Sequence, residues 1–236
     1  MNILVIPDIH LKPWMFERAA EIMRSGAAER AVCLMDIPDD WGQEVNLDLY
    51  RETFAKAIKF QKSFPETLWC YGNHDLSYVW NQSESGFSPF ALPVVMEKLR
   101  ELQEALPDER QMAYIHRIDD VLFLHGGLTH PFVKYYASDL DYEDTDGILR
   151  RINTLDCEEM WDDASPIWYR PQFDYERMYR SDVILQIVGH TPMEKIQKEE
   201  NVISCDVFST YSSGEPIGDE RYLIIDTMTW EYKETS

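Results

Sequence analysis

The sequence predicts an α/β fold built on parallel strands, and two features of its first third support this prediction. Short apolar runs at 3–6, 31–35 and 67–71 have the length and composition of buried strands. Between them, apolar residues at 16–23 and 47–58 recur with the spacing of amphipathic helices. A strand-helix-strand-helix-strand order is typical of parallel strands joined by right-handed crossovers.

The rest of the chain continues this mixture with less regularity. We expect a helix over 95–106 and a hairpin formed by 113–118 and 121–124. Pro93 indicates a loop at 92–93. Further strands are predicted at 183–188, 202–207, 222–225 and 230–232.

Composition and charge narrow the class of protein. A chain of 236 residues suits one domain, and 44% hydrophobic residues with few Gly and Pro exclude a disordered chain. Its 43 acidic and 22 basic residues give a net charge of −21, so we expect neither nucleic acid nor a membrane as partner. No apolar run spans a bilayer, the first residues do not form a signal peptide, and the four cysteines are scattered. We therefore expect a reduced, cytoplasmic protein.

Metal-binding or catalytic residue types directly follow five of the apolar runs. These residues are Asp8, His10, Asp36, Asn73, His74, His125 and His190. Because ligands bind beyond the carboxyl ends of strands in α/β sheets, the side chains would meet on one rim if the runs share a sheet. Their oxygen and nitrogen donors suit Mn²⁺, Fe or Zn²⁺. Six ligands fit two ions better than one, and Asp36 is the candidate bridging carboxylate.

Each motif alone has a plainer interpretation. An Asp-x-His sequence occurs by chance, and a Gly-Asn-His-Asp sequence or a Gly-Gly pair after a histidine is compatible with a simple turn. Their joint occurrence at five strand ends favours a site. We interpret the remaining histidines, His116 and His130, as surface or hydrogen-bonded structural residues, and the acidic segment 139–163 as a solvated helical face.

The ordered set of motifs resembles the calcineurin-like metallophosphoesterases, and within them the phosphoprotein phosphatase branch with its bacterial serine/threonine phosphatase and diadenosine tetraphosphatase relatives. The motifs are Asp8-Ile9-His10, Met35-Asp36-Ile37-Pro38-Asp39-Asp40, Gly72-Asn73-His74-Asp75, His125-Gly126-Gly127 and Gly189-His190-Thr191-Pro192. Pro192 and the segment Ile167-Trp168-Tyr169-Arg170 resemble that branch in particular. The resemblance covers residues 3–206. It implies a single domain, 1–236, with a central β-sandwich of two mixed sheets flanked by helices in four layers, and insertions around 76–112 and 130–170.

The resemblance also implies roles for individual residues. The ligands of two divalent ions would be Asp8, His10, Asp36, Asn73, His125 and His190, with Asp36 shared. Manganese is our assignment for these ions, and iron or zinc are the alternatives. His74 would protonate the leaving oxygen and Asp39 would orient it, while Arg170 and Asn73 would bind the phosphoryl group.

Two residues depart from the family pattern. Met35 replaces the usual Gly, which we interpret as a modest packing change. Asp40 stands where the branch has a phosphate-binding Arg, and a carboxylate there would repel phosphate.

These observations predict a dinuclear-metal-dependent phosphomonoesterase of protein-phosphatase type, with a metal-bridging hydroxide as nucleophile. Its substrate would be a phosphorylated small molecule, nucleotide or protein. One alternative is a nucleotide phosphodiesterase or dinucleoside polyphosphate hydrolase, which the carboxylate of Asp40 makes a serious rival. Another is a non-catalytic interaction module, which the complete ligand set disfavours.

Overall fold

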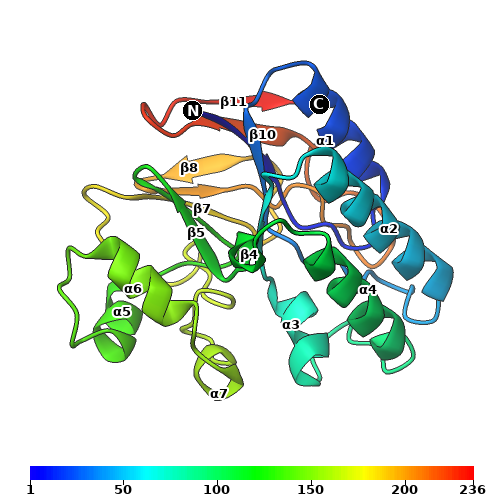
Figure 1. Ribbon diagram of the computed structural model, residues 1–236, viewed down its shortest axis with the longest axis horizontal. Helices are drawn as coiled ribbons and strands as arrows, with labels where there is room; N and C mark the ends of the chain where they lie inside the picture. Colours follow the sequence, from blue (N-terminus) through cyan, green and yellow to red (C-terminus); the bar gives the residue numbers. More distant parts are fainter.

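A computed structural model, which describes residues 1–236, places the first and last strands of the chain in one six-stranded sheet (Figure 1). Its strands are β1 (Asn2–Ile6), β2 (Arg30–Cys33), β3 (Leu68–Cys70), β4 (Met112–Ala113), β10 (Tyr222–Asp226) and β11 (Tyr232–Thr235). The strand order is β11-β10-β1-β2-β3-β4. Strands β1 to β4 are parallel, as predicted for the first three, and β10 pairs antiparallel with β1 and β11.

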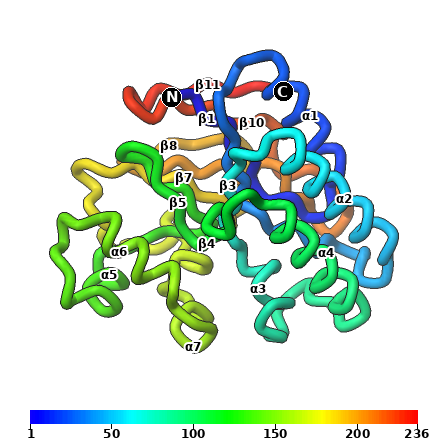
Figure 2. Tube along the Cα trace, in the orientation of Figure 1, coloured from blue at the N-terminus to red at the C-terminus, as the bar shows by residue number.

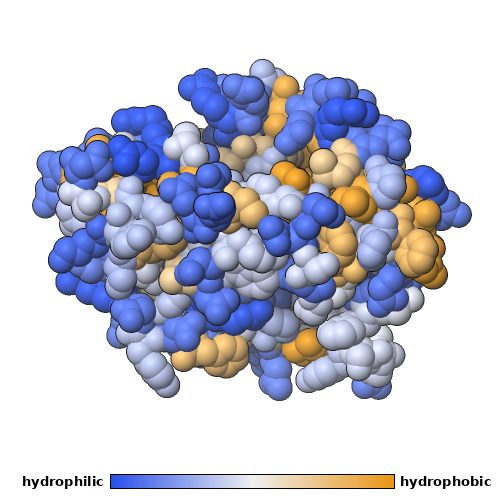
Figure 3. All heavy atoms as spheres, turned by 90° about the horizontal axis from the view of Figure 1, so that it is seen from below, coloured by the Kyte–Doolittle hydropathy of each residue, from blue (hydrophilic) through white to orange (hydrophobic).

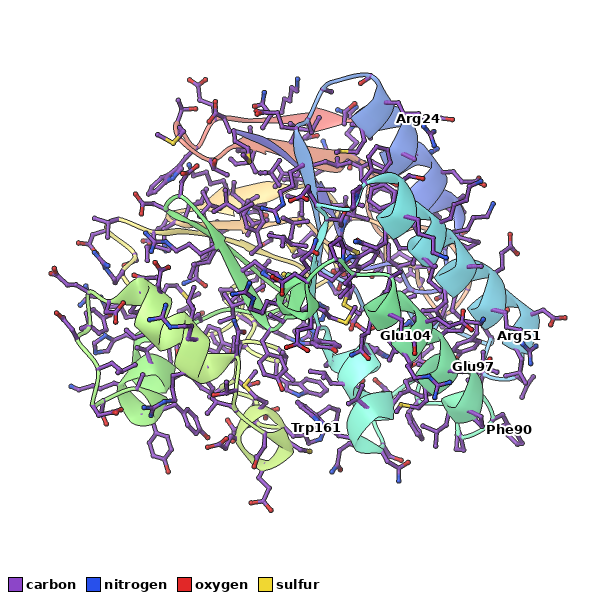
Figure 4. All side chains as sticks on the ribbon, viewed as in Figure 1. Arg24, Arg51, Phe90, Glu97, Glu104 and Trp161 are labelled. Atoms are coloured by element: carbon purple, nitrogen blue, oxygen red, sulfur yellow. The ribbon has the colours of Figure 1, made fainter.

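Helices cover the outer face of this sheet (Figure 1). They are α1 (Trp14–Arg24), α2 (Leu47–Ser63) and α4 (Leu92–Glu104), with the shorter α3 (Asn73–Trp80) and the 3₁₀ helix Glu109–Gln111 nearby. Phe16 of α1 packs on Trp69 of β3, with ring centroids 6.0 Å apart. The opposite faces are charged: Arg51 of α2 and Glu97 and Glu104 of α4 are exposed (Figure 4). Burial of one apolar face per helix thus fixes the helices on the sheet.

The second sheet has five strands and carries the middle of the chain. Its strands are β5 (Ile115–Ile118), β6 (Val121–Leu124), β7 (Leu185–Val188), β8 (Gln197–Glu199) and β9 (Val202–Ser204), in the order β5-β6-β7-β9-β8. Strands β5 and β6 form the predicted hairpin, and β6, β7 and β9 are parallel. Between β6 and β7 the chain forms α5 (His130–Tyr136), α6 (Thr145–Ile152) and α7 (Cys157–Met160), which lie together on one side of the molecule (Figure 2).

The two sheets share one core. A cluster of 46 buried hydrophobic residues includes Val5 of β1, Phe123 of β6 and Ile187 of β7, so side chains of both sheets interdigitate. A second cluster of 21 buried residues lies beneath α5, α6 and α7. The expected sandwich of two mixed sheets flanked by helices is therefore confirmed.

The local structure adds detail to these expectations and corrects one of them. The five apolar runs before the motifs are divided between the sheets, because β1, β2 and β3 belong to the first sheet and β6 and β7 to the second. Residues 92–93, predicted as loop, open α4, since Pro is tolerated in the first turn of a helix. The short elements α3, α5 and β8 were not anticipated, because each is too short for a clear periodic pattern.

The surface is mostly hydrophilic on the face that the space-filling view shows (Figure 3). Figure 3 shows a face on which hydrophilic residues predominate and hydrophobic residues form separate small patches. Within segment 139–163, Asp144 and Asp156 cap α6 and α7 by accepting hydrogen bonds from backbone N–H groups. None of the helices combines the length and the apolar character that crossing a bilayer requires.

His116 is a buried structural histidine rather than a surface one. Its Nε2 atom lies 3.1 Å from the carbonyl oxygen of Trp69, and burial lowers its pKa to about 4. The unfolded chain therefore binds a proton first, at its ordinary pKa near 6.5. The stability that neutral His116 contributes is complete above that pH and is lost as the pH falls towards about 4.

We expect His116→Gln, which keeps a donor for the Trp69 carbonyl, to flatten this dependence. Between pH 7 and pH 5 the variant should lose about 2 kcal/mol less unfolding free energy than the wild type. Urea denaturation at the two pH values measures the difference, with His130→Gln as the matched control. Parallel losses in the wild type and His116→Gln would contradict this interpretation.

Candidate metal centre

The carboxyl ends of strands from both sheets meet at one edge of the sandwich. The loop after β1 is joined to the loop after β2, because the backbone N–H of His10 donates to the carbonyl of Asp36 at 2.8 Å. Across the sheets, Nδ1 of His125 lies 3.0 Å from the carbonyl oxygen of Leu34. Within the second sheet, the N–H of Gly189 donates to the carbonyl of His125 at 2.9 Å. These contacts bring four of the five sequence motifs into one neighbourhood, and the bond from the backbone N–H of His74 to Asp36 adds the fifth.

Asp36 lies at the centre of the cluster. It belongs to two groups whose potential ligand atoms lie within 4.8 Å of one another, His10-Asp36-His74 and Asp36-His125-His190. Its Oδ2 atom is 3.1 Å from Nε2 of His125 and 3.9 Å from Nε2 of His10. Its Oδ1 atom accepts the backbone N–H of His74 at 2.9 Å. One carboxylate therefore faces ligands on both sides, as a bridging group must.

Asp8 and Asn73 complete the set of six predicted ligands. Oδ2 of Asp8 accepts the backbone N–H of His190 at 2.8 Å and lies 3.9 Å from Nε2 of His125. Oδ1 of Asn73 lies 3.0 Å from the same His125 nitrogen. The structure thus brings all six residues together, although only Asp36, His10, His125 and His190 fall in the two tight groups.

Two buried polar atoms of this cluster have no hydrogen-bond partner. They are Oδ1 of Asp8 and Nε2 of His190. A buried donor or acceptor left unpaired costs about 1–3 kcal/mol, so native structures rarely keep one without a function. A carboxylate oxygen and an imidazole nitrogen are both divalent-metal ligands, so the residues present fit such an ion.

Glycine is required beside two of the aspartates. A Cβ atom on Gly72 would collide with the carboxylate of Asp36, and one on Gly189 would collide with the carboxylate of Asp8. The backbones of both motifs therefore approach the carboxylates more closely than any other residue allows.

Burial and neighbouring charges give three of the candidate ligands the protonation states that suit metal binding. Burial lowers the pKa of His10 to about 4 and that of His190 well below its ordinary value, so both imidazoles are neutral at pH 7. Burial raises the pKa of Asp36, but the charges of His125 and His74 outweigh it and hold that pKa well below the usual range. Neutral imidazoles and an ionised carboxylate bind a cation without first releasing a proton.

The pKa values of the candidate ligands His125 and Asp8 are both raised. Burial lowers the pKa of His125, but Asp36 and Asp8 raise it to about 9. Burial, followed by the charge of Asp206, raises the pKa of Asp8 well above its ordinary value. These buried carboxylates repel one another, and a cation bound among them would reduce that repulsion.

His74 and Asp39 form a hydrogen-bonded pair next to this cluster. Nδ1 of His74 lies 3.0 Å from Oδ2 of Asp39, whose Oδ1 accepts the hydroxyls of Tyr50, at 2.8 Å, and Tyr78. Burial lowers the pKa of His74, but the carboxylates of Asp36, Asp39 and Glu84 raise it to about 10. His74 is therefore a protonated imidazolium at neutral pH, held in one orientation by a buried carboxylate.

Arg170 reaches the same cavity from the segment before β7. The N–H groups of Gly126 and Gly127 donate to the carbonyls of Pro166 and Tyr169, at 2.8 and 3.0 Å, which attaches this segment to the loop after β6. Nη1 of Arg170 in turn donates to the carbonyl of His190 at 2.8 Å. The cavity has a volume of about 550 Å³, and its lining includes His10, Asp36, Asn73, His74, Arg170 and His190.

Three acidic residues near the site were not anticipated. The carboxylate of Asp75 accepts the N–H groups of Asp36 and Gly72, at 2.8 and 3.1 Å, and burial raises its pKa to about 7. Glu84 accepts from Nδ2 of Asn73 at 2.8 Å. Asp206 follows β9 and lines the cavity. Asp206 could have been recognised as an acidic residue near a sixth strand end. It was missed because the predicted strand 202–207 included it, whereas β9 ends at Ser204.

The two departures from the family pattern have different consequences from those expected. Met35 has a φ of +56°, a left-handed conformation that favours glycine, so its effect lies in the backbone and not only in packing. Asp40 does not face the cavity as an isolated charge. Its Oδ2 atom is 3.3 Å from Nζ of Lys12, which offsets the repulsion expected for phosphate.

The family of the chain follows from a comparison with protein-family models. The model described as calcineurin-like phosphoesterase matches residues 1–194. The chain belongs to this family. This calcineurin-like phosphoesterase is therefore a phosphoester hydrolase of a family that depends on two metal ions, and it carries candidate ligands for them. A search of curated proteins found no match.

Solved structures agree with the fold of this calcineurin-like phosphoesterase. A cold-active protein-tyrosine phosphatase of a psychrophilic Shewanella species matches 100% of this chain and 80% of its own, with a TM-score of 0.59 and 16% identity. An archaeal phosphodiesterase matches 100% of this chain and 99% of its own, with a TM-score of 0.45 and 18% identity. At 16% identity, the first likeness shows the shared fold alone.

Proposed function

We propose that the protein is a phosphomonoesterase that uses two divalent ions, with manganese as our assignment. The observation that carries this proposal is the position of Asp36, whose carboxylate faces two groups of ligands while its backbone neighbourhood holds the His74-Asp39 pair. A shared carboxylate beside a protonated imidazole supports hydrolysis of a phosphoester.

Each of the six ligands has a proposed place. Asp8, His10 and Asp36 would hold the first ion, and Asp36, Asn73, His125 and His190 the second. Ions bound there supply Lewis acidity, which lowers the pKa of water and stabilises negative charge on phosphoryl oxygens. The unpaired atoms of Asp8 and His190 support this assignment.

The residues of the chain perform the remaining tasks. Hydrolysis of a monoester forms a bond between phosphorus and a water oxygen and breaks the bond to the ester oxygen, which must take up a proton to leave as an alcohol. We assign His74 as the donor of that proton, because its ring lines the cavity and is held by Asp39, and the neighbouring carboxylates raise its pKa. Asp39 holds the His74 ring, and Arg170, with Asn73, binds the phosphoryl oxygens.

The cavity supports a monoester over a polyphosphate substrate. Among its lining residues Arg170 provides the only Lys or Arg side chain, whereas Asp40, Glu44 and Asp206 are acidic. A dinucleoside polyphosphate would bring several further negative charges with no Lys or Arg side chain beyond Arg170 in the lining to bind them. This observation disfavours the polyphosphate alternative and leaves a nucleotide phosphodiesterase as the second candidate.

A substrate panel tests the proposal. Protein treated with a chelator should be inactive, and added Mn²⁺ should restore hydrolysis of p-nitrophenyl phosphate. Bis(p-nitrophenyl) phosphate and a dinucleoside tetraphosphate should be hydrolysed more slowly, and a phosphopeptide tests protein substrates. Faster hydrolysis of the bis-ester would support the phosphodiesterase, and no bound or restorable metal would support an interaction module.

Two further predictions complete the proposal. We propose one domain across 1–236, because both sheets contribute to one core, with α3 and α4 as the insertion at 76–112 and α5 to α7 as that at 130–170. All four cysteines are free, which is compatible with the cytoplasmic location that we still predict.

A further inference from the structure

Trp41 is an exposed aromatic residue that is held in a fixed position. Its side chain is 59% exposed, yet both of its N–H groups are bound within the protein. The backbone N–H donates to Oδ1 of Asp40 at 2.8 Å, and Nε1 of the indole donates to the carbonyl of Thr210 at 3.1 Å. A tryptophan that is held through its backbone and its ring nitrogen and is open to solvent is prepared to contact a ligand.

Asp40 is the residue that organises this arrangement. Besides the N–H of Trp41, its Oδ1 accepts the hydroxyl of Thr210 at 3.1 Å, and its Oδ2 pairs with Lys12. The carboxylate thus links the loop after β2 to the loop that follows β9. Asp40, which stands where related enzymes have a phosphate-binding Arg, here holds Trp41 and Thr210 in place through hydrogen bonds.

The indole lines the same cavity as the metal centre. Trp41, Thr210 and Tyr211 share the lining of the 550 Å³ cavity with His74 and Arg170. Tyr211 is itself 53% exposed, so two large aromatic side chains stand at the cavity while their surfaces remain open to water. The leaving group of a substrate bound at His74 would therefore lie in a cavity that these two rings also line.

We propose that Trp41 and Tyr211 form a subsite for an aromatic ring on the leaving group of the phosphoester. This inference rests on the proposed phosphomonoesterase function. An aromatic ring on the substrate covers apolar area on the indole, and its geometry selects a planar group over a saturated one. The absence of a Lys or Arg side chain other than Arg170 from the lining disfavours a leaving group that carries further phosphates. A phenol ring and a nucleobase share the required chemistry.

Benzyl phosphate and cyclohexylmethyl phosphate provide the test, because their leaving alcohols are similar in size and acidity and differ in planarity. With Mn²⁺, the wild-type kcat/KM should favour the benzyl ester by about tenfold. Trp41→Ala should abolish this preference and Trp41→Phe should keep most of it. Tyr135→Ala, which removes another exposed aromatic ring on α5, should leave it unchanged.

Equal rates for the two esters in the wild type, or an equal fall for both in Trp41→Ala, would overturn the subsite. Calorimetric binding of benzylphosphonate and cyclohexylmethylphosphonate separates this failure from that of the proposed function, because neither compound needs to be hydrolysed. Preferential binding of benzylphosphonate without turnover of any ester would overturn the phosphomonoesterase and retain the subsite. Equal binding of both would overturn the subsite whatever the activity.

A further comparison in the same assay distinguishes a phenol ring from a nucleobase as the group that the subsite binds. O-phosphotyrosine, a nucleoside monophosphate and O-phosphoserine differ in the ring near the phosphate. The subsite predicts that at least one of the first two exceeds O-phosphoserine in kcat/KM and loses that advantage in Trp41→Ala. Preference for O-phosphoserine in the wild type would contradict it.

Discussion

Asp36→Asn should reduce metal-dependent hydrolysis by on the order of 10³-fold or more, because the proposed bridging carboxylate loses its charge. The side-chain oxygen of Asn can still accept the N–H of His74, so the local backbone is preserved. The attraction to His125, 3.1 Å away, is weakened in the same step. Mass spectrometry of the purified variant should show loss of both ions, and kcat/KM should fall in parallel.

A matched substitution shows whether the effect is specific to this position. Asp48→Asn changes the same side chain on α2, where the carboxylate is 96% exposed and pairs only with Arg51. We expect wild-type metal content and rate in this control, since exposed pairs contribute little. An Asp36→Asn protein that retains both ions and full activity would refute the bridging assignment.

His74→Asn should keep the metals and still slow hydrolysis of esters with poor leaving groups by about 10²–10⁴-fold. The variant removes the imidazolium that we assign as proton donor, whereas the carboxylate of Asp36 and its other contacts remain. An ester whose leaving oxygen is already a weak base, such as p-nitrophenyl phosphate, needs the proton less and should lose much less rate. A series of aryl and alkyl phosphates measured with both proteins gives the dependence on leaving-group acidity.

Asp39→Asn tests the same proton donor through a smaller change, because it keeps His74 and removes only the charge of its hydrogen-bond partner. The hydrogen bond from Asp39 is one cause of the raised pKa of His74, so its loss should move that pKa down. The alkaline limb of the rate profile should then shift to lower pH, while the metal content stays the same. If His74→Asn slows all esters equally, His74 acts in positioning or metal retention and not as the proton donor.

The motifs of the candidate site can be recognised in the sequence without knowledge of the topology. Ligand motifs are local: Asp8 and His10, or Gly72 and Asn73, lie a few residues apart and follow apolar runs that are visible by inspection. Their assignment needs no knowledge of the topology, because any arrangement that aligns the strand ends brings them together. All six candidate ligands accordingly lie in one neighbourhood, although the strands that precede them belong to two sheets.

Features that depend on contacts between distant segments could not be predicted in this way. Asp75 supports Asp36 through backbone N–H groups, and Glu84 reaches Asn73 from a loop without a periodic pattern. The partners of Asp40 are 28 and 170 residues away, so its replacement of an Arg suggested repulsion, whereas the folded chain supplies Lys12 and Thr210. Residue identity indicates what a side chain can do, and only the tertiary contacts determine which of these options it takes.

The contact between His125 and Leu34 has a consequence for how the protein matures. A carbonyl oxygen only accepts, so Nδ1 of His125 carries a hydrogen, and Nε2 is the nitrogen that faces Asp36 and Asn73. Once Nε2 gives up its proton, the remaining tautomer is therefore set by the contact between the loop after β6 and the loop after β2, which belong to different sheets. On the proposed ligand assignment, which includes His190, the complete set of ligands would be assembled only after most of the chain has been synthesised.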